Sequence, residues 1–323
     1  MRYLVTGGAG FIGSNLVRSL IARGDTVRVL DNFSAGKREN LEGISGPLEI
    51  VEGDVRELRV CMDACDGVDG VFHEAAVGSV PRSVEDPLTS HLINVDGTLH
   101  VLLAARDRKA RRVVYASSSS VYGDAPERVK TEDLPARTIS PYAVSKLGGE
   151  LYTLVFSKIY GLEGVALRYF NVFGPRQDPE SMYAAVVPRF VSALIRGEAP
   201  TIFGDGEQTR DFTYVENVVR ANLLAMECPA EACGKAYNVA CGSTTSVNRL
   251  YRLIRENVGG RAARIKPIHA PGRAGDVRDS LASIDAIGAA LGYVPTIDVE
   301  EGIRLTVEWY RGRFGKPARS EDT

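Results

Sequence analysis

The stretch LVTGGAGFIG, residues 4–13, joins a short β-rich segment to a helical pattern. Its glycines have the spacing of a dinucleotide-binding turn between a strand and a helix. In such a turn Gly7 makes the tight bend, Gly10 lets the backbone approach a pyrophosphate, and Gly13 allows close helix–strand packing. The helix N-terminus adds N–H donors and the positive end of its dipole. The stretch therefore predicts a Rossmann-type fold starting at the N-terminus.

Short β-rich runs alternate with helical patterns through the first half of the chain. The β-rich runs are RYLVT, TVRVL, LEIVE, DGVFH, RVVYA and GVALR. Helical patterns such as FIGSNLVRSLIARG and SPYAVSKLGGELYTLVFSKIYG lie between them. This alternation predicts a mostly parallel, doubly wound sheet with helices on both faces. Ligands are then expected at the carboxyl ends of the strands.

The alternation loosens after residue 172, where GPRQDP forms a turn-rich break. We assign residues 1–172 to a dinucleotide-binding Rossmann domain and residues 173–323 to a smaller C-terminal α/β lobe that binds substrate. Segments near 212–217 and 236–240 are expected to return to the first domain. The expected fold class is α/β, a doubly wound parallel sheet with this second lobe.

The composition excludes several classes of protein. The 323 residues carry a net charge of −2 without a basic stripe, which argues against nucleic-acid binding. The sequence has no signal peptide pattern and no apolar stretch of about 18 residues, so we expect no membrane span. The five cysteines form no C-x-x-C motif and the four histidines are scattered, so we expect free thiols in the cytoplasm and no metal site.

The second strand ends in VRVLD, which places Asp31 at its carboxyl end. A carboxylate there accepts hydrogen bonds from both ribose hydroxyls and repels a 2′-phosphate, which favours NAD over NADP. The nearby cations Lys37 and Arg38 could pair with a 2′-phosphate, so NADP stays an alternative cofactor. After the third strand, Asp54 and Val55 are placed to touch the adenine. The fourth strand is followed by two small residues, Ala75 and Ala76, which would let a cofactor approach the backbone closely.

The stretch SPYAVSK, residues 140–146, reads as a helix start with serine as N-cap and proline in the first turn. Tyr142 and Lys146 are four apart and so share one face of that helix. A lysine cation beside a phenol favours the phenolate and lowers the tyrosine pKa. Four serines, Ser117 to Ser120, are expected at the carboxyl end of the fifth strand. These groups are the candidate reacting residues.

Together these motifs resemble the extended short-chain dehydrogenase/reductases. T-G-x-x-G-x-x-G, the strand-end serine, Y-x-x-x-K, RYFNVFGPRQ and RDFTYV all match. Within that family the chain is most similar to the NAD-dependent UDP-sugar 4-epimerases, from residue 1 to about residue 312. The resemblance implies that a hydride leaves the sugar C4 for NAD and returns to the other face of a 4-keto intermediate, so NAD stays tightly bound.

The resemblance also implies roles for individual residues. Tyr142 is the catalytic acid/base, Lys146 holds the nicotinamide ribose, and Ser118, with Ser119, holds the sugar 4-oxygen. The expected NAD-binding residues are Gly7, Gly10, Phe11, Ile12, Gly13, Asp31, Asn32, Ser34, Gly36, Asp54, Val55, Ala75, Ala76, Asn94, Ser117, Tyr142, Lys146 and Tyr169. The expected substrate-binding residues are Ser79, Ser118, Ser120, Tyr142, Asn171, Ala185, Val186, Phe203, Arg210, Arg273, Asp276 and Ser280.

The strand-end serines help to distinguish 4-epimerisation from the other reactions of the family. Related 4,6-dehydratases and decarboxylases carry an acidic residue there, whereas this chain has only serines. Ser280 aligns with a position that flanks the sugar, where a small residue admits a 2-N-acetyl group. We therefore expect UDP-GlcNAc/UDP-GalNAc as substrates, and also UDP-Glc/UDP-Gal. A UDP-glucuronate 4-epimerase and a non-catalytic NAD- or nucleotide-sugar-binding regulator remain as alternatives.

Two adjacent glycines interrupt the helix that begins at Ser140. Gly148 and Gly149 each cost about 1 kcal/mol relative to alanine in a helix, so close helix packing is expected to compensate. In the family this helix and the segment near 90–107 form a four-helix dimer contact. A homodimer is the expected assembly.

Overall fold

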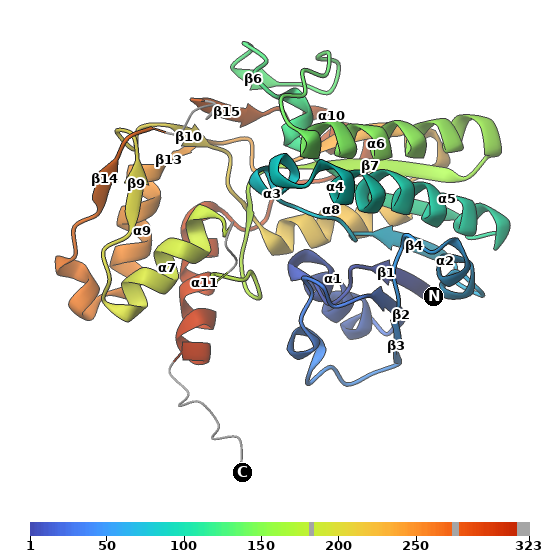
Figure 1. The fold of residues 1–323 in the computed structure, drawn as a ribbon, viewed down its shortest axis with the longest axis horizontal. Coiled ribbons are helices and arrows are strands. Elements are labelled where there is room, and N and C mark those ends of the chain that lie inside the picture. The colour runs from blue at the N-terminus through green and yellow to red at the C-terminus, as the bar shows by residue number, and fades with distance from the viewer. Residues whose placement is uncertain (181–183, 273–277, 315–323) are drawn as a thin grey trace.

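The computed structural model describes residues 1–180, 184–272 and 278–314. Its main sheet has seven parallel strands in the order β3-β2-β1-β4-β5-β7-β12 (Figure 1). The strands are β1 (Arg2–Thr6), β2 (Thr26–Asp31), β3 (Leu48–Glu52), β4 (Gly70–His73), β5 (Arg112–Ser118), β7 (Glu163–Tyr169) and β12 (Lys235–Val239). The strand order reverses direction between β1 and β4, and this is the point where a doubly wound sheet binds its ligand. The expected fold class is confirmed.

Helices cover both faces of this sheet. One face carries α2 (Leu58–Ala64), α5 (Gly97–Asp107) and α6 (Pro141–Tyr160), and the other carries α1 (Phe11–Ala22), α8 (Val215–Glu227) and α10 (Asp285–Leu291). Strand side chains alternate between the two layers, because successive residues of a strand point to opposite faces. Tyr3 and Val5 pack with the α1 and α8 side, whereas Leu4 packs with the α2 and α5 side.

A second buried cluster is formed by later segments of the chain, which lie beside the main sheet in Figure 1 and which we call the second lobe. Its helices are α7 (Val186–Arg196), α9 (Val247–Val258) and α11 (Val299–Phe314). Its short strands are β8 (Val172–Phe173), β9 (Thr201–Phe203), β10 (Thr209–Arg210), β11 (Thr213–Tyr214), β13 (Thr245–Ser246), β14 (Ile268–Ala270) and β15 (Asp279–Ala282), and β6 (Val129–Lys130) joins them. Parallel pairing of β12 with β7 brings a late segment back into the main sheet.

The remaining elements are short and shape the edge where the strands end. They are α3 (Val80–Glu85), α4 (Pro87–His91), a π-helical turn η2 (Leu92–Asp96), and the 3₁₀ turns η1 (Arg38–Leu41), η3 (Ser119–Tyr122), η4 (Ala230–Ala232) and η5 (Gly260–Arg264). Within the described residues, no helix combines the length and apolar character needed to cross a bilayer.

The start of α6 has the expected form. Ser140 is the N-cap, its Oγ accepts from the Ala143 N–H at 3.2 Å, and Pro141 occupies the first turn. Gly149 allows the helix to approach β5, because a Cβ there would lie 2.3 Å from Tyr115 Oη. The close approach inferred from the sequence therefore exists at this glycine.

We expect Gly149→Ala to lower the free energy of unfolding by about 1–3 kcal/mol, since overpacking outweighs the gain in helix propensity. Gly312→Ala is the matched control. This glycine lies in α11 with open space around its Cβ position, so the same change should be neutral or stabilising by up to about 1 kcal/mol. Urea denaturation of both variants measures the difference, and equal effects would contradict the packing argument.

Candidate active site

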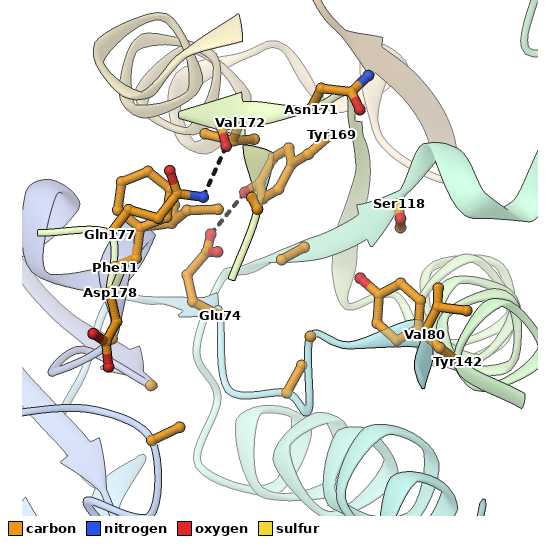
Figure 2. Close-up of a pocket in the computed structure, with 18 of the residues that line it drawn as sticks. Phe11, Glu74, Val80, Ser118, Tyr142, Tyr169, Asn171, Val172, Gln177 and Asp178 are labelled. Atoms are coloured by element: carbon orange, nitrogen blue, oxygen red, sulfur yellow. Dashed lines mark hydrogen bonds between the residues drawn. The ribbon is translucent and has the colours of Figure 1, made fainter. Parts of the chain in front are cut away.

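A large cavity opens at the carboxyl ends of the main strands. Its volume is about 1330 Å³, and residues from both lobes line it. Figure 2 shows Phe11, Glu74 and Tyr142 entering it from three different elements. A cavity of this size at the switch point of an α/β sheet is where a nucleotide and a second ligand can meet.

The glycine-rich turn forms one end of the cavity and fits a pyrophosphate. Gly7 has φ +67°, and a Cβ there would lie 2.7 Å from the Ala75 backbone. A Cβ on Gly13 would lie 2.2 Å from Gly7 O. Gly10 is the N-cap of α1, with no side-chain cap and no acidic residue in the first turn. The first-turn backbone therefore faces the cavity without a competing side chain, as binding of an anion requires.

Asp31 lies behind the cavity wall. Its Oδ2 accepts from Ala9 N–H at 2.9 Å and its Oδ1 accepts from Phe33 N–H at 2.8 Å. A Cβ on Gly36 would lie 2.8 Å from Asp31 Oδ2, so any larger residue at this position would crowd the carboxylate. Burial raises the pKa of Asp31, while these backbone hydrogen bonds oppose the rise. The arrangement fixes the glycine turn and the next loop around one carboxylate.

The Tyr142 and Lys146 side chains both line the cavity from α6. The first turn of α6 is tied down on its other sides. Tyr142 N–H donates to Ser83 Oγ at 3.0 Å, and Ser145 Oγ donates to Tyr142 O at 2.8 Å. Asn94 Nδ2 then donates to Ser145 Oγ at 2.9 Å. These contacts fix where the phenol lies.

Burial dominates the electrostatics of this pair. Burial raises the pKa of Tyr142, and hydrogen bonding with Ser118 lowers it only in part. Burial also lowers the pKa of Lys146 to about 8, with the charge of Glu74 acting in the opposite direction. Burial therefore sets the net direction of the Tyr142 pKa, and the lowering expected from Lys146 together with a nicotinamide stays a prediction. A further positive charge is required to favour the phenolate, and an oxidised nicotinamide carries one.

The strand-end serines have different partners. Ser117 Oγ donates to Glu150 Oε2 at 2.6 Å. Ser118 caps η3 by accepting from Ser120 N–H at 3.2 Å, and it also interacts with Tyr142. Ser120 Oγ is buried and makes no hydrogen bond to any described residue. An unsatisfied buried hydroxyl beside a cavity is an available donor for a polar ligand.

The second lobe supplies the opposite wall. Asn171 has φ +35°, and its Nδ2 donates to Asp211 O at 3.1 Å. Parallel pairing of β10 with β15 places Ser280 directly opposite Arg210. All three side chains expected here, Asn171, Arg210 and Ser280, line the cavity. A cation and two polar side chains thus line the same cavity as the serines and Tyr142.

Most of the residues expected from the sequence meet in this cavity. Those that line it are Gly7, Gly10, Phe11, Ile12, Gly13, Ser34, Gly36, Ala76, Ser117, Ser118, Ser119, Ser120, Tyr142, Lys146, Tyr169, Asn171, Ala185, Arg210 and Ser280. Described residues that were expected but do not line it are Asp31, Asn32, Asp54, Val55, Ala75, Ser79, Asn94, Val186 and Phe203. Arg273 and Asp276 lie outside the described residues.

Several of the residues that do not line the cavity make structural contacts, and their expected binding roles stay predictions. Asp54 pairs with Arg56 at 2.7 Å and accepts from Asn32 Nδ2 at 2.8 Å. Ser79 is the N-cap of α3 and accepts from Arg82 N–H. Asn94 Oδ1 accepts from Val77 N–H at 2.8 Å, so it supports the cavity wall from behind.

The sequence interpretation missed several cavity residues. Glu74 stands in HEAA before two small residues, and no pattern in that stretch marks it as a cavity residue. Arg176 and Asp178 lie in GPRQDP, which read only as a turn. Lys37 Nζ pairs with Asp178 at 3.0 Å, joining the loop after β2 to the second lobe. An ion pair between residues so far apart in the chain produces no recognisable motif in the sequence around either residue.

Comparison with known proteins agrees with this geometry. The model of the "NAD dependent epimerase/dehydratase family" matches residues 3–240. A UDP-glucose 4-epimerase of Mycolicibacterium smegmatis is 41% identical over 317 residues, covering 97% of this chain and 99% of that protein.

Two solved structures are similarly close. A UDP-N-acetylglucosamine 4-epimerase of Methanobrevibacter ruminantium, in complex with UDP-N-acetylmuramic acid, has 40% identity and a TM-score of 0.91, covering 97% of this chain and 98% of that one. A UDP-glucose 4-epimerase of Thermotoga maritima, with UDP-glucose, has 39% identity and a TM-score of 0.91. The match covers 97% of this chain and 100% of that one. The glycine turn, the strand-end serine and the Tyr142–Lys146 pair therefore have the context expected of them, and the chain belongs to the NAD-dependent epimerase/dehydratase family.

Proposed function

We propose that this chain is a UDP-sugar 4-epimerase that uses bound NAD, with UDP-GlcNAc and UDP-GalNAc as its preferred substrates. One observation carries the proposal: Ser118, Tyr142 and Lys146 line the same cavity as the glycine turn. The residues that follow Ser118 are serines, so the strand end offers no carboxylate for elimination. The high identity to named 4-epimerases supports the same reaction.

NAD supplies the hydride acceptor and donor when it is bound. The chain contributes proton transfer and orientation. Tyr142 takes the proton of the sugar 4-hydroxyl as its C4 hydride leaves, and later returns it to the 4-oxygen. Ser118 holds the same oxygen and the phenol together, as its interaction with Tyr142 allows. Lys146 stabilises the phenolate once burial is offset by the cofactor charge.

Epimerisation requires the 4-keto sugar to turn over while its nucleotide stays in place. We assign retention of the diphosphate to Asn171 and Arg210, which line the same cavity as Tyr142. The sugar is then free to present either face to the cofactor. We keep residues 1–172 as the proposed NAD-binding domain and residues 173–323 as the proposed sugar-binding lobe, with 212–217 and 236–240 returning to the first domain. Ser118, Tyr142 and Asn171 of the first domain also contact the sugar nucleotide in this proposal.

Ser280 is proposed to leave room for the 2-acetamido group. It lines the cavity next to Arg210. We expect Ser280→Tyr to lower kcat/KM for UDP-GlcNAc by about 100-fold, since a bulky ring would clash with the acetamido group at a cost of about 1–3 kcal/mol. Turnover of UDP-glucose should change less than threefold. Parallel kinetics on both sugars measure the ratio, and an equal loss on both would contradict this role.

We propose a cytoplasmic enzyme that acts as a homodimer. All five cysteines are free thiols, which fits a reducing compartment. An apolar face runs along α6, where Val144, Leu151, Val155 and Ile159 are 45–66% exposed. Their spacing places them on one side of the helix, and a second copy of that helix would bury them.

We expect sedimentation velocity at micromolar protein to give a dimer. Leu151→Asp combined with Val155→Asp should give a monomer, because each buried carboxylate would have no partner across the apolar face. Leu58→Asp, at an exposed apolar residue on a different helix, is the matched control and should stay dimeric. A monomeric wild type, or dissociation of the control variant alone, would contradict the proposed dimer.

The proposed reaction is tested by incubating the purified protein with UDP-GlcNAc and no added NAD, followed by proton NMR of the anomeric signals. UDP-GalNAc should form until the two sugars reach equilibrium. UDP-glucose and UDP-glucuronate are the comparison substrates. Absence of any product with all three, with and without added NAD, would reject the proposal.

A further inference from the structure

Glu74 is a carboxyl group within the proposed cofactor site, and the reaction described above gives it no role. It follows the last residue of β4, and its side chain lines the cavity. Its N–H donates to Thr6 O at 3.1 Å, at the end of β1. A Cβ on Gly7 would lie 2.9 Å from Glu74 C, so the glycine turn packs directly on the Glu74 backbone. Glu74 therefore lies next to the turn that holds the pyrophosphate.

The Glu74 side chain is held in one orientation. Tyr169 Oη donates to Glu74 Oε1 at 2.7 Å, as Figure 2 shows by a dashed line. Asn222 Nδ2 donates to Tyr169 Oη at 2.8 Å. Since Asn222 supplies the donor that this phenol oxygen accepts, the phenol's own proton is directed to Glu74. The contacts form a chain from α8 through β7 to the carboxyl group.

Glu74 also lies between the two functional ends of the cofactor site. In Figure 2 its side chain points into the pocket between Phe11, at the start of α1, and Tyr142. The hydride has to reach a sugar carbon beside Tyr142, and the pyrophosphate binds at the N-terminus of α1. The nicotinamide half of a bound dinucleotide would have to span these two points, and Glu74 lies between them.

Few charges face this carboxyl. Lys146 from α6 and the neutral phenol of Tyr169 from β7 are its electrostatic partners. His73, the preceding residue, contributes no charge at neutral pH, because burial lowers its pKa to about 3. Burial raises the pKa of Glu74 to about 7, against the lowering effects of the Tyr169 hydrogen bond and the Lys146 charge. The group therefore changes protonation near neutral pH.

We propose that Glu74 is a positioning residue that matches its charge to the nicotinamide: ionised opposite the cationic ring and protonated opposite the neutral ring. This inference rests on the proposed function, where the ring changes charge twice in each turnover. Glu74 takes one proton from water when the hydride pair leaves the sugar C4 for the ring. It releases that proton to water when the hydride returns, so no proton is gained or lost over the cycle.

As a consequence, the protonation state of Glu74 depends on whether NAD⁺ or NADH is bound. A cationic ring lowers the pKa of Glu74, and a neutral ring leaves it raised. Between those two values the NADH complex carries one more proton than the NAD⁺ complex. NADH binding therefore weakens relative to NAD⁺ binding as pH rises, by at most tenfold per pH unit.

The test is a competition at equilibrium that needs no turnover. Purified protein is exchanged into fixed mixtures of NAD⁺ and NADH at pH 6, 7 and 8, free cofactor is removed rapidly, and the bound ratio is measured by chromatography. The ratio of the NADH and NAD⁺ dissociation constants should rise about tenfold from pH 6 to pH 8. In Glu74→Gln, which keeps an acceptor for Tyr169, the ratio should stay within about twofold.

Two further variants separate this role from a structural one. Tyr169→Phe removes a hydrogen bond that lowers the Glu74 pKa, so the rise should remain but move to higher pH. Glu39→Gln removes one negative charge from a carboxylate that also lines the cavity, and it should leave the rise where it is. If Glu74→Gln does not fold, the shift in Tyr169→Phe decides the question.

Three results would overturn the inference: a wild-type ratio that does not change with pH, an equal rise in Glu74→Gln, or no shift in Tyr169→Phe. Failure of the wild type to bind either form of the cofactor would be a different result. It would reject the proposed function itself. Cofactor binding with no epimerase turnover would reject the reaction while leaving the proton linkage intact.

Discussion

Replacing Tyr142 by Phe is expected to lower kcat for epimerisation by about 10²- to 10⁴-fold, since the variant lacks the group that accepts and returns the 4-hydroxyl proton. The ring itself remains, so packing against α3 and the first turn of α6 should be preserved. The bound NAD content and the affinity for UDP-GlcNAc should stay within about threefold of the wild type, because the phenol oxygen acts mainly in the transition state.

Tyr160→Phe is the matched control for that variant. Tyr160 ends the same helix, is 50% exposed, and lies away from the cavity lining, so its turnover should equal that of the wild type. Single-turnover kinetics of both variants, alongside cofactor content, measure the effect. Wild-type kcat in Tyr142→Phe would mean that another group transfers the proton.

Breaking the ion pair between Glu150 and Arg168 should have the largest effect on stability. The two side chains are 2% and 8% exposed, with Arg168 Nη2 lying 2.6 Å from Glu150 Oε1. Arg168 Nε donates to Glu150 Oε2 at 3.0 Å, and Ser117 Oγ donates to the same oxygen at 2.6 Å. Burial lowers the pKa of Arg168, but the hydrogen bonds and charge of Glu150 outweigh it and raise that pKa. The guanidinium therefore stays charged.

We expect Glu150→Gln to lower the free energy of unfolding by about 3–5 kcal/mol, because it leaves a buried cation without its counter-charge. The double variant Glu150→Leu with Arg168→Met removes both charges and should lose less than the single variant. Urea denaturation followed by circular dichroism gives both values. A loss below about 1 kcal/mol in Glu150→Gln would show that the pair is not needed.

The same pair links stability to the active site. Glu150 holds Ser117, and the next residue along β5 is Ser118. In the double variant, Ser117 loses this acceptor and the strand end is less fixed. A fall in kcat at unchanged fold would show this positioning effect.

Local sequence patterns predicted the elements that depend on short-range physics. The glycine turn of residues 4–13 requires one backbone conformation and one close packing, and both exist at Gly7 and Gly13. Ser140 and Pro141 start a helix because one caps it and the other fits its first turn. The positions of Tyr142 and Lys146 on one face follow from helical geometry alone.

Interactions between distant segments could not be predicted in this way. The contact of Asp31 with the ribose stays a prediction, but no sequence pattern indicated that backbone N–H groups of two loops also donate to its carboxylate. The place of Asn94 beside the cofactor also stays a prediction, and its hydrogen bonds to Val77 and Ser145, which join the loop after β4 to α6, were not indicated by the sequence. The raised pKa of Tyr142 also depends on burial, which no spacing in the sequence reveals.

Glu74 illustrates the same limit most clearly. In the sequence it is one acidic residue between His73 and two alanines, and nothing nearby indicates a partner. Only the pairing of β4, β5 and β7 brings Tyr169 within hydrogen-bond distance. Its proposed linkage to the cofactor charge could not have come from the sequence.

The central claim is that a hydride leaves the sugar C4 and returns to the same carbon without leaving the enzyme. It is tested most directly with UDP-GlcNAc carrying deuterium at C4, in ordinary water with no added NAD. The account predicts UDP-GalNAc that retains the deuterium at C4. Product that has lost deuterium to the solvent, or a dehydrated sugar in place of the epimer, would contradict it.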